Sequence, residues 1–530
     1  MRGCHCMRSC VCATRASCDA KPRQTDSTHD LQHRAEWPEA DSSARGRSGH
    51  SRTPGFADFF SLEVPSMLKK CHLVFLSLLL VAVCAPIARA DTGADDVSDT
   101  MSMLRHAVSM QTVQGKRQVP ALAHYFAAKL ESAGFAKSDI EIIPVGDTAA
   151  LVVRYRGTGD AKPILLSGHM DVVPANPAEW IDGDPFKVAE RDGWLYGRGV
   201  DDMKESDVIL IQTLIRLKRE HFVPSHDLIL LLSGDEETSQ ATTRVLVKRF
   251  HDAAFLLNAD AGGGILNAQG NPAVFRLQTA EKTYADFQLT ATSNGGHSSE
   301  PDPETNTMYR IARALDKIST YQFPVQYNKT TLASLKATGE HGHGRLAEAM
   351  VKFAADPTDS DAAVVISSDP ATVGQIRTTC IATMMGAGVE RNVLPKRASA
   401  NINCRIFPGV SAASVQAALV SAIGDAGVKV TVRSPAPVES PVSPLLPKVM
   451  DAVTVAVHEH YPGLEIVPVM SSGASDSMYF RRAGVLCYGL NFMFAKPGGL
   501  HAHGVNERIR ASDVPKALEF WHSLLTKLAK

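Results

Sequence analysis

The sequence has no charge imbalance, no apolar run long enough to span a membrane and few cysteines outside its first residues. Its formal net charge is -1, from 55 basic and 56 acidic residues, so no basic excess indicates nucleic-acid binding. Beyond residue 90 only Cys380, Cys404 and Cys487 remain. Three cysteines do not make a disulfide framework, so we expect packed cores to stabilise the fold, even in an oxidising compartment. With 530 residues, 44% of them hydrophobic, the chain can form two or three globular domains.

The first ninety residues differ from the rest in composition. Residues 1–66 hold five cysteines in the first eighteen positions and almost no apolar periodicity, so we expect a disordered, non-native extension from a start codon placed too far upstream. Metal binding by these cysteines is the less favoured alternative. Residues 67–90 have the layout of a secretory signal peptide, with lysines, an apolar segment and Ala88-Arg89-Ala90 at its end.

A membrane anchor is the competing interpretation of residues 67–90. The apolar run is shorter than the roughly 20 residues that a spanning helix needs, which favours cleavage after Ala90. We therefore expect an exported protein, periplasmic or secreted, with no stable membrane span after signal cleavage.

The stretch LLSGDEET, residues 231–238, joins a short apolar run to Asp235, Glu236 and Glu237. Such a run is typical of a strand buried on both faces of a parallel sheet, where the chemistry lies beyond the carboxyl ends of the strands. Three adjacent carboxylates repel one another and resist desolvation unless a cation lies among them. A solvated acidic turn is the alternative for an isolated motif of this kind.

Predicted strands and helices alternate up to about residue 277. This order indicates an α/β fold with a mostly parallel sheet covered by helices. The predicted strands are 150–155, 163–167, 227–232 and 254–257, and a helix opens after YGRGVDDMK, residues 196–204. The pattern resumes after a proline-rich linker, residues 435–444. Residues 91–277 and 435–530 are therefore predicted to form one catalytic, metal-binding domain.

Residues 278–434 follow a different pattern, which predicts an inserted α+β domain of ferredoxin-like type. Two helices would cover one face of a small antiparallel sheet, with strands at 284–292, 378–385, 398–406 and 428–432. Residues 330–370 exceed what such a unit needs. Within them, His341-Gly342-His343 is interpreted as part of a solvated loop rather than a metal site.

Carboxylates and imidazoles beside glycines, or at the ends of apolar runs, are candidate metal ligands: His169, Asp202, Glu237, Asp260 and His503. Without a thiolate, this set suits a pair of borderline cations such as zinc. Asp171 lies two residues after His169, as would a carboxylate that orients a metal-bound imidazole. On its own, His-x-Asp more often contains a structural histidine. Glu236 then remains free for proton transfer.

Taken together, the motifs resemble the di-zinc metallopeptidase family of aminoacylase, carboxypeptidase G, acetylornithine deacetylase and succinyl-diaminopimelate desuccinylase. They are HMDVVP, YGRGVDDMK, SGDEET, NADAGG, GGHSSEP, NVLP, RIFPG, GASD and HGVNE. NADAGG and the long insertion are most similar to the carboxypeptidase S-like branch. The resemblance covers nearly all of residues 91–530 and none of residues 1–90. It implies two Zn²⁺ ions, with Co²⁺ or Mn²⁺ as alternatives, and an insertion that acts as a lid or dimerisation domain.

The resemblance also implies how the ligands are shared. His169 and Asp260 would bind one zinc ion, Glu237 and His503 the other, and Asp202 would bridge both. Asp201 and His501 compete for these roles. The family spacing to the lysine of YGRGVDDMK selects Asp202, and the spacing to Asn506-Glu507 selects His503. Glu205 departs from the glycine that is common in relatives, and we expect a local change only.

The remaining roles come from the same resemblance. Glu236 would be the general base, Asp171 would orient His169, and His297 would stabilise the oxyanion from the insertion of the same chain or of a partner. Arg405 would hold a substrate carboxylate, and Asn392 and Gly473 would line the same pocket. Because these groups and the metals lie on different domains, closure of the insertion would assemble the site.

The function that we expect is that of an exported zinc-dependent metallohydrolase of carboxypeptidase or dipeptidase type. It would cleave the amide bond of small peptides or N-acyl amino acids. One alternative is a cytoplasmic-type N-acyl-amino-acid deacylase of the acetylornithine or succinyl-diaminopimelate type. Another is a non-catalytic relative that acts as a binding module, which would predict broken ligands. A homodimer through the insertion stays open.

Overall fold

The structure is a computed structural model that describes residues 92–159 and 161–530. The predicted extension, residues 1–66, and the predicted signal peptide, residues 67–90, lie outside the described residues. Within the described ranges, no helix is both long enough and apolar enough to cross a membrane.

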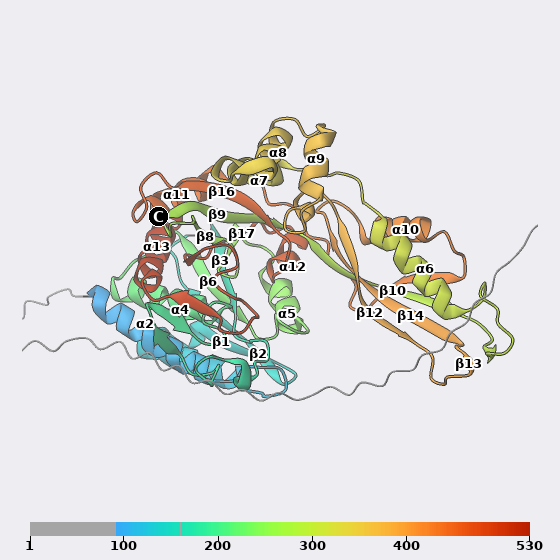
Figure 1. Cartoon of the computed structure of the whole chain (residues 1–530). Helices are drawn as coiled ribbons and strands as arrows, with labels where there is room; N and C mark the ends of the chain where they lie inside the picture. The colour runs from blue at the N-terminus through green and yellow to red at the C-terminus, as the bar shows by residue number, and fades with distance from the viewer. Residues whose placement is uncertain (1–91, 160) are drawn as a thin grey trace, which may run out of the picture. The chain divides into compact units, whose positions relative to one another are not determined.

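A ten-stranded mixed sheet organises the larger part of the molecule (Figure 1). Its order is β1-β2-β6-β3-β7-β17-β9-β8-β18, and β16 pairs with β9. The central strands β6, β3, β7 and β17 run parallel, whereas β1 and β2 are antiparallel. The strands are β1 (Ile140–Val145), β2 (Thr148–Tyr155), β3 (Ala161–His169), β6 (His226–Ser233), β7 (Phe255–Asn258), β8 (Gly263–Leu266), β9 (Pro272–Glu281), β16 (Glu465–Ser471), β17 (Cys487–Gly489) and β18 (Phe494–Ala495).

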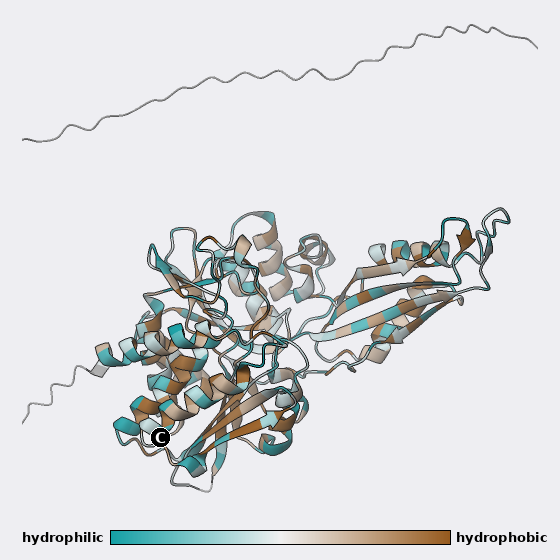
Figure 2. Ribbon diagram, turned by 90° about the horizontal axis from the view of Figure 1, so that it is seen from below, coloured by the Kyte–Doolittle hydropathy of each residue, from teal (hydrophilic) through white to brown (hydrophobic). Residues whose placement is uncertain are grey.

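Helices bury both faces of this sheet, as the uninterrupted apolar runs predict. In β6, Leu228, Leu230 and Leu232 belong to one apolar core, while Ile229 and Leu231 belong to a second core on the opposite face. In Figure 2, where brown marks hydrophobic residues, several strands of the large sheet are brown over part of their length. The first core includes α2 (Thr92–Ser109), α3 (Val119–Ser132), α4 (Lys204–Arg219), α11 (Pro447–His458) and α13 (Asp513–Leu528). The second includes α5 (Ala241–Phe250) and α12 (Ser477–Arg482).

A small antiparallel sheet forms the centre of the insertion, with the order β12-β14-β10-β15. Its strands are β10 (Thr283–Thr292), β12 (Thr379–Ala387), β14 (Arg397–Ile406) and β15 (Val428–Val432). Helices α6 (Thr307–Thr320) and α10 (Ala412–Ile423) share an apolar core with this sheet. The arrangement confirms the predicted α+β architecture. The limits at residues 278 and 434 stay a prediction.

The stretch 330–370, to which the sequence patterns assigned no element, contains three helices, and the predicted loop around His341-Gly342-His343 lies at the junction of the first two. The helices are α7 (Lys329–His341), α8 (Gly344–Ala355) and α9 (Ser360–Ser367). A capping box between Asn328 and Thr331 begins the first helix, and Leu335, Phe353 and Ile366 contribute to a separate core. The two histidines are at the junction of α7 and α8, where His341 Nε2 lies 3.2 Å from Glu465 Oε2.

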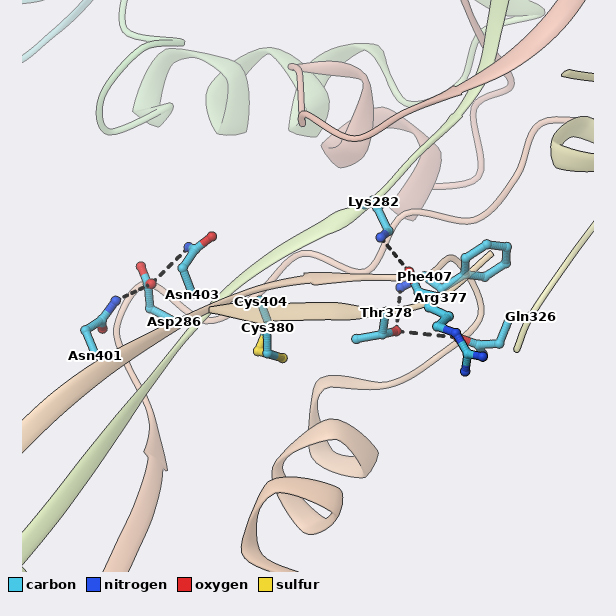
Figure 3. Close-up of a disulfide and its surroundings, with 10 residues drawn as sticks. All are labelled: Lys282, Asp286, Gln326, Arg377, Thr378, Cys380, Asn401, Asn403, Cys404 and Phe407. Atoms are coloured by element: carbon cyan, nitrogen blue, oxygen red, sulfur yellow. Dashed lines mark hydrogen bonds between the residues drawn. A yellow bond between two sulfur atoms is a disulfide. The ribbon is translucent and has the colours of Figure 1, made fainter. Parts of the chain in front are cut away.

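One disulfide links Cys380 of β12 to Cys404 of β14, which are directly opposite each other in the antiparallel register (Figure 3). The sequence patterns did not predict this bond. The two residues are 24 positions apart, and only the strand register brings them together. Cys487 is buried and is not part of a disulfide.

Candidate metal centre

Three predicted ligands follow neighbouring parallel strands. His169 is the last residue of β3, Glu237 lies just after β6, and Asp260 lies just after β7. Because β3 lies between β6 and β7 and runs parallel to both, their carboxyl ends meet at one edge of the sheet. The sheet topology therefore brings together three side chains that are far apart in the sequence.

Two further predicted ligands reach this edge from connecting segments. Asp202 precedes α4, and His503 lies between β18 and β19 (Arg508–Arg510). Asp202 lies between the two imidazoles, with Oδ1 3.1 Å from His169 Nε2 and Oδ2 2.9 Å from His503 Nε2. His503 Nε2 is also 2.8 Å from Glu237 Oε1, and His169 Nε2 is 3.8 Å from Asp260 Oδ1. The structure thus gathers all five candidate ligands, and we call this group the acidic cluster.

The alternatives Asp201 and His501 lie outside these contacts. His501 Nδ1 donates to the carbonyl of Val505 at 3.2 Å, and its Nε2 is 3.4 Å from Arg508. The Asp201 amide donates to Glu507 at 2.9 Å. The geometry therefore agrees with the choice of Asp202 and His503 made from the motif spacing.

The donor atoms fit a divalent cation. His169, Asp202 and Glu237 each offer one ligand atom within 4.8 Å of the others, and this is the one such group of three in the described part of the chain. His169 Nδ1 lies 3.0 Å from the carbonyl oxygen of Asp171, which can only accept a hydrogen bond. Nδ1 therefore carries a hydrogen, and Nε2, which faces Asp202 and Asp260, is the nitrogen that would bind a cation in the neutral imidazole. Imidazole nitrogens and carboxylates without a thiolate suit zinc.

The electrostatics of the acidic cluster agree with this fit. Burial raises the pKa of the Asp260 and Glu236 carboxyls well above the usual value. Burial alone would lower the pKa of His169, but its contact with Asp202 and the charges of nearby carboxylates raise it well above normal. Hydrogen bonds with Asp202 and Glu237 raise the pKa of His503 to about 10. A bound cation would relieve the repulsion among the carboxylates.

The three consecutive acids of SGDEET have separate surroundings. Asp235 is buried and accepts hydrogen bonds from the amides of Ala241 and Thr242 at 2.7 and 2.9 Å, so it caps the start of α5. Glu237 enters the acidic cluster, with its side chain only 7% exposed. Glu236 stands next to it. A solvated acidic turn, the alternative interpretation, is therefore wrong.

Asp171 contacts both His169 and the backbone of Glu236 and Glu237, but with different atoms. Its main-chain carbonyl holds His169 Nδ1, while its buried carboxylate accepts the amides of Glu236 and Glu237 at 3.0 and 3.1 Å. The carboxylate itself lies 3.6 Å from His169 Nδ1. Asp171 therefore fixes the position of the predicted base as well as that of the histidine.

Two buried carboxylates, one of which holds the backbone of Asp202, were not predicted from the sequence. Glu507 Oε1 accepts the amides of Gly199, Asp201 and Asp202 at 2.8, 2.9 and 3.1 Å. Asp476 accepts the hydroxyls of Ser233 and Thr243, both at 2.5 Å. Both residues are in recognised motifs, HGVNE and GASD. The sequence alone, however, does not distinguish an acidic residue that accepts buried hydrogen bonds from one that is exposed to solvent.

The groups predicted to bind substrate lie on other elements. His297 is exposed on β11 (Gly296–His297), which pairs with β13 (Val393–Leu394) beside Asn392. Arg405 lies on β14 with its guanidinium 4.8 Å from the Tyr284 ring centre. Gly473 lies in the loop between β16 and α12. Within residues 92–159 and 161–530, none of these side chains hydrogen-bonds to the acidic cluster, so their roles stay predictions.

Glu205 is fully buried at the first turn of α4. Its Oε1 accepts from Asn491 Nδ2 at 3.1 Å and from the Ser206 hydroxyl at 2.6 Å. These contacts tie α4 to the segment between β17 and β18 and touch no member of the acidic cluster.

Comparison with known proteins identifies the family. Residues 165–527 match the model of peptidase family M20/M25/M40. Human N-fatty-acyl-amino acid synthase/hydrolase PM20D1 is 30% identical over 377 residues, 69% of this chain and 74% of the relative. Probable carboxypeptidase S-like 2 of Dictyostelium discoideum is 25% identical over 399 residues, 72% of this chain and 75% of the relative.

A solved structure shares the fold. The M20 family metallo-carboxypeptidase Sso-CP2 of Sulfolobus solfataricus superposes with a TM-score of 0.62 at 17% identity, covering 81% of this chain and 99% of that one. The resemblance predicted from the motifs is thereby confirmed, and the chain belongs to peptidase family M20/M25/M40, a family of hydrolytic enzymes.

Proposed function

We propose that this chain is an exported zinc-dependent metallohydrolase that cleaves the amide bond of small peptides or N-acyl amino acids. The convergence of two imidazoles and three carboxylates beside Glu236 carries the proposal. The names of the human and Sulfolobus proteins, an N-fatty-acyl-amino acid synthase/hydrolase and a metallo-carboxypeptidase, support these substrate classes. A non-catalytic binding module is disfavoured because no ligand position is broken.

The acidic cluster would hold two zinc ions, or Co²⁺ or Mn²⁺ in their place. His169 and Asp260 would bind the first, Glu237 and His503 the second, and Asp202 both. Bound divalent ions of this kind act as Lewis acids toward a carbonyl and make water a better nucleophile.

Glu236 would take the proton from the attacking water and pass it to the leaving nitrogen. Its amide is fixed by Asp171 at 3.0 Å, and its carboxylate Oε1 accepts from Gln240 Nε2 at 3.2 Å. One contact thus fixes the backbone of Glu236 and the other its carboxylate, and a general base needs such a fixed position in order to act repeatedly at one place.

The insertion would supply most of the remaining groups. Arg405 would bind the substrate carboxylate, Asn392 and Gly473 would line its pocket, and His297 would stabilise the oxyanion from the same chain or from a partner. Domain closure would bring these groups to the acidic cluster.

A homodimer through the insertion is supported by the outer strand of its sheet. Among the residues that the structure describes, strand β12 pairs with β14 on one side only, and it exposes Ile381, Met384 and Met385 at 68%, 64% and 60%. A second β12 would cover these side chains and the unpaired backbone groups.

Export is supported by the Cys380–Cys404 disulfide, since such bonds persist in oxidising compartments and are rare in the cytosol. The same bond disfavours the cytoplasmic-type deacylase, which is the second candidate function.

The decisive experiment is a hydrolysis screen of the purified protein, with and without added zinc, against dipeptides and N-acyl amino acids. We expect zinc-dependent cleavage of at least one class, and no cleavage by Glu236→Gln. A zinc-loaded protein that cleaves neither class, yet binds them, would favour the binding module instead.

A further inference from the structure

We propose that a cavity beside Glu237 is a substrate subsite in which Arg244 binds a carboxylate on the acyl side of the scissile amide bond. The cavity has a volume of about 770 Å³. Its wall includes Glu237, Ser239, Arg244, Pro435, Val438 and Tyr479, and we call it the Arg244 cavity. The inference rests on the proposed hydrolase function and names the substrate class more narrowly.

The Arg244 cavity adjoins the predicted reaction centre in two ways. Glu237, a member of the acidic cluster, forms part of its wall. In addition, Tyr479 OH donates to Gln240 Oε1 at 3.2 Å, and Gln240 Nε2 donates to Glu236 Oε1 at 3.2 Å. An occupant of the cavity therefore lies next to the same segment that positions the predicted base. Its volume is in the usual range of small-molecule sites.

Arg244 is available to bind an anion. Its Nη1 donates to the Ser239 carbonyl at 2.7 Å and lies 3.4 Å from Tyr479 OH, so neutral groups hold it in place. No carboxylate oxygen in the described ranges lies within the 4.0 Å of an ion pair with it. By contrast, Arg249 on the same helix binds both oxygens of Glu141 at 2.9 and 2.7 Å. Arg244 keeps further N–H donors in its planar guanidinium for an incoming carboxylate.

Another part of the wall is apolar. Pro435, Ala436 and Val438 belong to the segment that returns from the insertion to the large sheet. A ligand that suits both the apolar residues and Arg244 has a short aliphatic body and a terminal carboxylate. Because Arg405 is already predicted to bind the carboxylate of the leaving amino acid, the Arg244 cavity suits the acyl part. The substrate class is therefore an amino acid acylated by a short dicarboxylic acid.

A matched pair of substrates tests the proposal: N-glutaryl-leucine, and the same compound with a terminal carboxamide on the acyl chain. The zinc-loaded enzyme should show a kcat/KM about tenfold or more higher for the acid, as expected for one charge-assisted hydrogen-bonded pair. Arg244→Gln should reduce this ratio to about one, mainly through the acid substrate. The control Lys248→Gln removes a charge from the same helix, away from the cavity wall, and should keep the wild-type ratio.

Failure of the subsite and failure of the proposed hydrolase give different results. Equal rates for acid and amide in the wild type, or an equal loss for both in Arg244→Gln, would overturn the subsite while leaving the hydrolase intact. If neither compound is cleaved, calorimetry with glutarate on the zinc-loaded protein decides. Affinity about tenfold weaker in Arg244→Gln than in Lys248→Gln supports the subsite, as expected for the loss of one charge-assisted pair, and equal affinity in the two variants overturns it.

Discussion

Glu236 and Glu237 are neighbours in the chain, yet their side chains have different partners. Glu237 contacts His503 at 2.8 Å, whereas Glu236 contacts the side-chain amide of Gln240. We expect Glu236→Gln to lower kcat by about two to four orders of magnitude with an unchanged zinc content, because it removes the proton acceptor and keeps the shape. Kinetics combined with elemental metal analysis would measure both quantities. Near-normal turnover in this variant would remove Glu236 as the base.

Arg405 lies on the insertion, and its predicted task is to recognise a substrate carboxylate. We expect Arg405→Ala to raise KM by about tenfold or more for substrates with a free carboxylate, because a two-pronged charged hydrogen bond is lost. Substrates that are amidated at this position should lose much less. The comparison of KM for the two series is the measurement, and an equal loss in both would count against the role.

At the residue scale, the motifs predicted the acidic cluster well because strand ends and glycine turns mark its members in the sequence. His169 ends β3 and Asp260 follows β7, as the apolar runs before them suggested. The supporting contacts could not be predicted in the same way. Glu507 accepts three backbone amides and Arg244 faces a cavity, and both facts depend on atoms more than a hundred residues away.

At the scale of elements, the disulfide at the edge of the small sheet can be tested for its contribution to stability. The Cys380–Cys404 bond closes a loop of 24 positions between β12 and β14. We expect the double variant Cys380→Ser and Cys404→Ser to lower the free energy of unfolding of the insertion by about 3 kcal/mol, through greater freedom of the unfolded chain. Urea unfolding followed by circular dichroism would measure this loss.

Reducing agent supplies the control for the disulfide. The wild type in dithiothreitol should unfold like the double variant, and the double variant should not respond to dithiothreitol. Wild-type curves that coincide with and without the reductant would show that the bond contributes nothing to stability.

Element type was predictable wherever the hydrophobic period was clear, and less so elsewhere. Strand β15 has the predicted limits, residues 428–432, because the alternating pattern is distinct there. Residues 330–370 received no prediction of helix or strand because their helices are short and small residues such as Ala347, Ala349 and Ala363 occupy buried positions. A helix of this kind is stabilised by its neighbours in space, which the local pattern does not contain.

At the scale of the whole molecule, the site draws on segments that the chain places far apart. The acidic cluster extends from His169 to His503, with the insertion between its fourth and fifth members. The family motifs could predict this convergence. They could not predict that, within the described residues, Arg405 and His297 make no hydrogen bond to the acidic cluster, because the motifs do not contain the packing that sets the position of one domain against another.

Metal removal tests the molecule as a unit. Without cations, the carboxylates of Asp202, Glu237 and Asp260 face one another with only two imidazoles to offset them, so we expect chelation to abolish turnover and to lower Tm. An ion present at roughly a thousandfold excess over its Kd stabilises the native state by about 4 kcal/mol. Differential scanning calorimetry with and without chelator would measure the change, and added Zn²⁺ should restore both Tm and activity.

In Asp202→Asn, which weakens both predicted ion sites, added zinc should produce a much smaller shift in Tm. Active protein that contains no divalent ion, or a Tm that is indifferent to chelator, would contradict a metal centre at this position.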